Sequence, residues 1–88
     1  MRNILFQSGM IENEYQAHEY IGQVLGIPKG EAVDLDRIYM EIMSIREETE
    51  IELEDYELLV ERTQRFGLGL LKLLRDAARE SEYINFIW

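Results

Sequence analysis

The sequence predicts a single α/β domain, residues 1–88, with a three-stranded parallel sheet, about four helices and the order β-α-α-β-α-α-β. Three short segments, 3–7, 49–54 and 83–88, have the apolar or alternating character of strands, and longer segments with a helical apolar period separate them. Strands that lie about 20 or more helical residues apart are joined by crossovers, which favours a parallel sheet. The length fits one domain only, because a second would need roughly 50 residues of its own.

The first strand is followed by two predicted helices and the loop between them. The first helix runs from Glu14 to Gly26, where a glycine followed by Pro28 ends it. After a loop of residues 29–33, Asp34 is placed to cap the second helix, because its carboxylate can accept from the free amides of the next turn. The apolar residues of that helix then recur at helical spacing: Leu35, Ile38, Tyr39, Ile42 and Ile45.

The second half of the chain repeats the order strand, helix, helix. Residues 49–54 alternate between apolar and acidic side chains, so we expect a strand with one acidic face, at a sheet edge or near solvent. Asp55 can cap a helix that ends near Arg65. Gly67 and Gly69 are expected to bracket a break, after which a broad apolar face predicts the last helix.

The last segment should be a strand that contributes Ile84, Phe86 and Ile87 to the core. The strand order remains open. With right-handed crossovers, a sequential order places all helices on one face of the sheet, whereas a first strand between the other two places helices on both faces.

Charge is the most informative part of the composition. The chain carries 18 acidic and nine basic residues, a net charge of −9. Residues 31–61 hold twelve of the acids and only two arginines, a net −10, whereas the other 57 residues sum to +1. Such a chain repels nucleic acid and anionic membranes and attracts a basic protein. General solubility is the alternative explanation of the same charge.

Several function classes are excluded by what the sequence lacks. There is no cysteine and a single histidine, His18, so thiol catalysis, disulfides and the usual zinc sites are not expected. No phosphate-binding or nucleophile motif occurs, and we assign no catalytic residues, metal or cofactor. No segment has the apolar length of a membrane span or signal peptide, so we expect a soluble, cytoplasmic protein that is not an enzyme.

Three segments carry a resemblance to a known family. The first helix, with His18 and its closing Gly26-Ile27-Pro28, the Asp34-Leu35-Asp36-Arg37-Ile38-Tyr39 segment, and residues 63–87 are similar to barstar, the small acidic intracellular inhibitor of a ribonuclease. The match covers nearly the whole chain and is clearest in its last third. The resemblance implies a three-stranded parallel sheet with four helices, and an inhibitor that plugs a ribonuclease active site with its second helix and the loop before it.

The resemblance also implies a set of partner-binding residues. On the second helix these are Asp34, Asp36 and Tyr39, and on the final helix they are Asp76 and Glu80; we add Gly30 as part of the loop before the second helix. The sequence departs from the family at two places. Gly30-Glu31-Ala32 replaces an aromatic pair and a glycine, and Met40 stands where the family has an aspartate, with Glu41 pointing elsewhere on the helix.

Each candidate also has a structural explanation. Asp34 and Asp36 can stabilise the start of the helix, which is worth about 0.5–1 kcal/mol each, with or without a partner contact. Tyr39 fits a core position as well as an interface, Asp76 and Glu80 fit a solvated helix face, and His18 fits a structural role better than a partner contact.

The expected function is inhibition of a basic ribonuclease or related toxin. Two alternatives stay open: an acidic mimic of nucleic acid that occupies a DNA- or RNA-binding groove, and a small acidic interaction domain that assembles with itself. The sequence does not decide the oligomeric state.

Overall fold

The computed structural model describes all residues, 1–88. Three strands, four α-helices and one short 3-10 helix follow one another in the chain. In order they are β1 (Arg2–Gln7), the 3-10 helix η1 (Ser8–Met10), α1 (Glu14–Leu25), α2 (Leu35–Met43), β2 (Thr49–Glu54), α3 (Tyr56–Thr63), α4 (Arg65–Glu80) and β3 (Ile84–Ile87).

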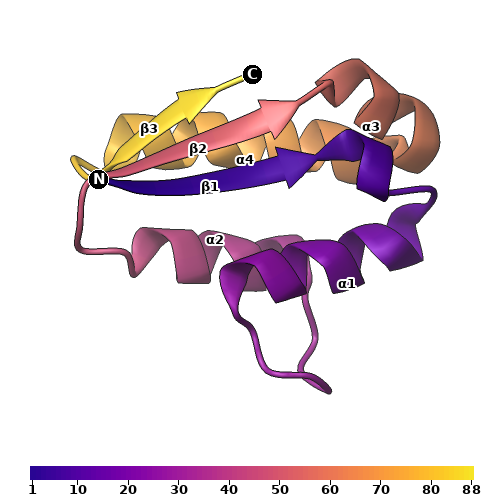
Figure 1. Ribbon diagram of the computed structural model, residues 1–88, viewed down its shortest axis with the longest axis horizontal. Coiled ribbons are helices and arrows are strands. Elements are labelled where there is room, and N and C mark those ends of the chain that lie inside the picture. Colours follow the sequence, from indigo (N-terminus) through magenta and orange to yellow (C-terminus); the bar gives the residue numbers. More distant parts are fainter.

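The strands form one parallel sheet in the sequential order β1-β2-β3, which confirms the predicted fold class. In its register, Ile4 lies beside Ile51, and Thr49 lies beside Ile84. Figure 1 shows α4 behind the strands and α1 and α2 on the β1 side, while the loop between α1 and α2 projects away from the rest.

Only one face of the sheet is covered. On β2, Thr49, Ile51 and Leu53 are buried, whereas Glu52 and Glu54 on the opposite face are exposed. The same alternation runs along β1, so the covered face belongs to the core and the bare face to solvent. This is the arrangement that right-handed crossovers give to a sequential strand order.

The bare face corrects two expectations. The strand of residues 49–54 is the central strand and not an edge strand, although its acidic face does reach solvent, as the other alternative expected, because no helix covers that side. Ile87 lies beside Glu52 in the register, so it is on the bare face and exposed, whereas Ile84 is buried and Phe86 half-buried as expected.

A single hydrophobic core holds the sheet and helices together. Its 17 buried residues come from the covered sheet face, Ile11 at the C-cap of η1, all four helices and the start of the α2–β2 connection. Ile45 is one of them, although α2 ends at Met43, two residues earlier than the apolar period suggested. Helix α4 is the largest contributor, with Phe66, Leu70 and Leu74 among its buried side chains.

The expected break at Gly67 and Gly69 is wrong. Both glycines lie inside α4, and the chain turns instead at Gln64, whose φ of 53° and ψ of −114° interrupt the helix between α3 and α4. The glycines serve close packing. A Cβ atom at Gly67 would lie 3.0 Å from Val60 Cα and 2.9 Å from Thr63 Oγ1.

Side-chain caps fix the start of three helices. Asn13 accepts from the Gln16 amide at 2.9 Å, Asp34 from the Arg37 amide at 2.8 Å, and Asp55 from the Leu58 amide at 3.4 Å. The caps expected at Asp34 and Asp55 are therefore confirmed. No helix of the protein is both long enough and apolar enough to cross a membrane.

Replacing Gly67 by Ala should destabilise the protein by about 1 kcal/mol. Overpacking against the α3 backbone costs about 1–3 kcal/mol, which outweighs the gain of up to about 1 kcal/mol in helix propensity. Urea unfolding monitored by circular dichroism measures the change. Gly9→Ala is the matched control, because no atom lies within 4 Å of its added Cβ, and it should stay within about 0.5 kcal/mol of the unsubstituted protein. Equal effects of the two substitutions would contradict the close α3–α4 packing.

Replacing Gln64 by Gly should stabilise the protein by about 1 kcal/mol. The positive φ at Gln64 strains a residue with a Cβ by about 1–3 kcal/mol, and glycine relieves this strain while losing about 0.5–1 kcal/mol to backbone entropy. The same substitution at Gln23, inside α1, should destabilise by up to about 1 kcal/mol. Thermal unfolding of both variants checks the pair, and a loss of stability in Gln64→Gly would contradict the turn geometry.

Candidate partner-binding face

Helices α2 and α4 lie against each other and form the site. The contact is closest at Gly69, where an added Cβ would lie only 2.6 Å from Leu35 Cδ1. Further along, the Tyr39 hydroxyl donates a hydrogen bond to the Glu80 carboxylate, so the two helices run in the same direction. The absence of a side chain at Gly69 thus lets Leu35 sit on α4 and brings both helices' polar residues to one surface.

A shallow open groove follows this contact. We name it the α2–α4 groove; it is lined by Leu35, Asp36, Tyr39, Gly69, Lys72, Leu73 and Asp76. Three of the six predicted binding residues, Asp36, Tyr39 and Asp76, therefore lie around one hollow, and Glu80 is joined to it through Tyr39. The groove has an apolar floor with a carboxylate on each helix.

Asp76 is the acid of the groove that is held by ion pairs. Its two oxygens accept from Lys72 Nζ and Arg79 Nη2, each at 2.9 Å. The side chain of Asp76 is 25% exposed, whereas those of Lys72 and Arg79 are 79% and 73% exposed. Hydrogen bonding from Lys72, with the positive charges of Lys72 and Arg79, holds the pKa of Asp76 below its ordinary value. Asp76 is therefore a half-buried anion held by two cations that are themselves largely exposed.

Tyr39 is half-buried and lines the α2–α4 groove from the side of α2. Its hydrogen bond to Glu80 favours the neutral phenol, and together with partial burial and the negative charge of Glu80 it raises the pKa of Tyr39 above the ordinary value. Tyr39 packs against the hydrophobic core with its ring while its hydroxyl stays at the surface. Core packing and a surface polar contact are thus both present in this residue.

The two aspartates at the start of α2 differ in their surroundings. Asp34 caps the helix, and it faces a second hollow beside Glu14, His18 and Arg65 instead of the α2–α4 groove. Asp36 lines both hollows, is exposed, and takes part in no side-chain hydrogen bond or ion pair. Asp36 is therefore the carboxylate of α2 that is free to meet a partner.

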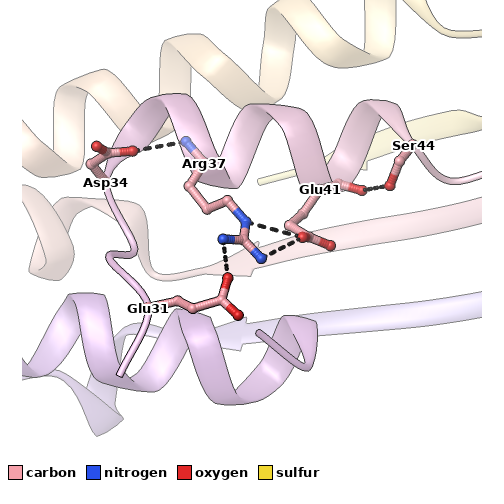
Figure 2. A network of polar contacts seen from close by, with 5 residues as sticks. All are labelled: Glu31, Asp34, Arg37, Glu41 and Ser44. Atoms are coloured by element: carbon pink, nitrogen blue, oxygen red, sulfur yellow. Dashed lines mark hydrogen bonds and ion pairs between the residues drawn. The ribbon is translucent and has the colours of Figure 1, made fainter. Parts of the chain in front are cut away.

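Arg37 holds a network on the far side of α2 that the sequence analysis missed (Figure 2). Its guanidinium pairs with Glu31 from the loop and with Glu41, at 3.0 Å, one helical turn later. Both contacts raise the pKa of Arg37 above its ordinary value. Two acids of the negative segment are thus already neutralised, and Glu41 does not take the place of the aspartate missing at Met40, whose own side chain is 66% exposed.

The i,i+4 spacing would have revealed these pairs. Arg37 with Glu41, and Lys72 with Asp76, stand four residues apart on helices, where opposite charges meet. The contacts of Arg79 with Asp76 at i,i+3 follow the same rule. This spacing identifies Glu41 and Asp76 as paired acids from the sequence alone, but not Glu31, which reaches Arg37 from the loop.

Gly30 lies apart from the groove. It sits on the loop between α1 and α2 with a φ of +91°, in the hollow that this loop forms with α1. His18 anchors the same loop: its Nδ1 contacts the Val33 carbonyl oxygen, its ring lies 4.7 Å from that of Phe66, and its Nε2 is 3.5 Å from Glu14. These contacts give His18 a structural role in positioning the loop.

No protein-family model matches the chain, and no curated protein matches it in sequence. No three His, Cys, Asp or Glu side chains gather closely enough to hold a metal ion. The function is therefore inferred from the charge and geometry of the α2–α4 groove.

Replacing Lys72 by Met should raise the pKa of Asp76 toward the ordinary carboxyl value, because the hydrogen bond from Lys72 is the largest cause of its lowering. A pKa that is lowered in the folded state stabilises the fold above the ordinary carboxyl pKa, and this contribution is lost as the pH falls through the lowered value. As the pH falls from the ordinary carboxyl pKa to the lowered pKa of Asp76, the variant should therefore lose less stability than the unsubstituted protein. Carbon-13 NMR titration of the Asp76 carboxyl measures the pKa.

Arg75→Met is the matched control for this titration. It removes one positive charge from the same helix, but the Arg75 guanidinium lies over the Trp88 ring, 5.6 Å from its centroid, and not at Asp76. The control should leave the pKa of Asp76 close to that of the unsubstituted protein. An equal rise in both variants would mean that the total charge of α4, and not the pairing, controls Asp76.

Proposed function

We propose that the protein is a barstar-like inhibitor that binds a basic ribonuclease or related toxin in the cytoplasm of the producing cell and blocks its active site with the α2–α4 groove. The observation that carries this proposal is the position of two carboxylates, Asp36 and Asp76, on opposite sides of one groove, with Tyr39 beside them. The resemblance in sequence places the family's partner contacts on the same two helices.

The groove has the chemistry that a nuclease active site would accept. Such a site is basic because it binds phosphates, so carboxylates held on rigid helices can take the phosphate positions and form charge-assisted hydrogen bonds. Asp36 brings an unpaired carboxylate, and Asp76 brings one whose position is already fixed. Tyr39 adds an aromatic surface of the kind that binding interfaces favour.

The present ion pairs of Asp76 leave it available to a partner. Lys72 and Arg79 are largely exposed, and exposed pairs of this kind contribute only about 0–1 kcal/mol. An arginine from the partner that excludes water can form a stronger, two-pronged contact with the same carboxylate. Binding would then replace the two weak ion pairs of Asp76 by one desolvated pair with the partner's arginine. Lys72 and Arg79 would move to the rim of the interface.

The rest of the acidic surface acts at a distance. Glu52 and Glu54 lie on the bare face of β2, on the opposite side of the sheet from the helices. They add to the negative field that steers a basic partner toward the protein, a role for which the barnase–barstar pair is the reference example. Their contribution should be to the association rate and should weaken with salt.

The double change Asp36→Ala with Asp76→Ala should weaken binding of the basic ribonuclease that co-purifies from the native host, while the melting temperature stays within a few degrees. Truncating one desolvated charge at an interface costs about 2–5 kcal/mol, so the dissociation constant should rise by roughly 30-fold or more. Surface plasmon resonance gives the rate constants, and a ribonuclease assay gives the inhibition.

The double change Glu52→Ala with Glu54→Ala removes the same two charges from the bare sheet face and is the control. It should slow association modestly at low salt and leave dissociation unchanged. Equal weakening by both pairs would mean that total charge and not the groove determines binding. Co-purification of a nucleic-acid-binding protein without nuclease activity would favour a mimic of nucleic acid over the inhibitor.

A further inference from the structure

A third hollow, in which Gly30 lies, is found between α1 and the loop that leads to α2, outside the α2–α4 groove. We name it the loop hollow, and its volume is about 230 Å³. One stripe of α1, at spacings of three and four residues, forms its wall: Tyr15, His18, Glu19, Gly22 and Gln23. The loop, from Ile27 to Val33, forms the opposite wall.

The loop hollow is held open by contacts at both ends of the loop. At the first end, Gly26 adopts the left-handed conformation and the Ile27 amide donates to the Gly22 carbonyl at 2.8 Å. At the other end, Val33 packs so closely on Gly22 that an added Cβ there would lie 2.9 Å from Val33 Cγ2. The contact of His18 Nδ1 with the Val33 carbonyl fixes the same end. The loop between these ends projects from the fold in Figure 1.

The size of the loop hollow suits one side chain. Pockets for drug-sized ligands measure about 300–1,000 Å³, so this hollow is too small for most of them. Its surface is apolar along Ile27, Pro28 and Val33, and aromatic at Tyr15 and His18. A fitting group therefore has an extended apolar body.

One free carboxylate and one aromatic ring of the loop hollow can receive a positive end on that group. Glu19 is exposed and makes no ion pair or side-chain hydrogen bond, whereas the other acid of the lining, Glu31, is already paired with Arg37 (Figure 2). Tyr15 adds an aromatic face, which attracts a cation. Lys29 is the one cation of the lining, and it also makes no ion pair, so it opposes a positive ligand.

We propose that the loop hollow is an anchor site for a single arginine side chain of the protein partner. The aliphatic part of the arginine packs on Ile27, Pro28 and Val33, and its planar guanidinium stacks on Tyr15 and bonds the Glu19 carboxylate. That the arginine comes from a basic ribonuclease or toxin rests on the proposed function, whereas the recognition of an arginine side chain is a property of the hollow itself. The site gives Gly30 and its loop a contact separate from the α2–α4 groove.

The experiment uses N-acetyl-L-arginine amide as the probe, titrated into the protein of residues 1–88 and followed by amide chemical shifts in NMR. We expect saturable shifts confined to the stripe of α1 and to the loop of residues 27–33. Glu19→Gln should weaken binding at least about fivefold, since it removes the charge from the hydrogen bond, and Lys29→Met should strengthen it. Glu61→Gln removes one charge from α3 that is likewise exposed and unpaired, and should change the affinity less than about twofold.

Three outcomes would overturn the anchor site. N-acetyl-L-leucine amide producing the same shifts at the same affinity would show an apolar hollow without selectivity for a cation. Shifts spread over all acidic residues would show unspecific attraction to the negative chain, and an absence of shifts would exclude binding. None of these results depends on a ribonuclease, so they separate failure of the anchor site from failure of the inhibitor proposal, which the Asp36 and Asp76 variants test.

Discussion

The contact of Leu35 with Gly69 is the constraint on which the site depends. With no side chain at Gly69, α2 can approach α4 closely enough for Leu35 to sit on it and for Tyr39 to reach Glu80. A larger residue at this position would separate the helices and widen the α2–α4 groove. The positions of the carboxylates on the acidic surface therefore depend on the apolar contact between Leu35 and Gly69. Packing of the helices, and not attraction between charges, places them.

Sequence patterns predicted most of the fold and part of the site. Strand alternation and the crossover rule were enough to predict the parallel sheet, and the cap at Asp34 was enough to predict the start of α2. Each of these is a local or topological signal. Gly67 and Gly69 were misread as a break, since glycine inside a helix signals flexibility in the sequence alone, whereas here it allows close contact with Val60 and Leu35. The break lies at Gln64, whose residue type gives no indication of a positive φ.

Counting charges is a poor guide to which acids a partner can use. Residues 31–61 carry the excess of negative charge, yet Glu31 and Glu41 are bound to Arg37 within that segment. Asp76 belongs to the less acidic part of the chain and is held by two cations that are themselves exposed. The useful distinction is between acids whose cation is itself largely buried, as Arg37 is, and acids whose cations are exposed and can leave at low cost, as Lys72 and Arg79 are. Neighbouring positions on a helix reveal the pairs, and the burial of each member reveals which pairs can open.

The bare face of the sheet bears on how crowded copies of this protein behave. A flat surface of strands without a covering layer invites a second sheet to stack on it, and the apolar Leu5 and Ile87 flank Glu52 in the same row. The glutamates of β2 run down the middle of that surface, so two such faces repel each other before their apolar side chains meet. The uncovered face of the sheet is in this way protected against stacking. The protein can therefore stay unassociated at high concentration, with its helical side free to bind.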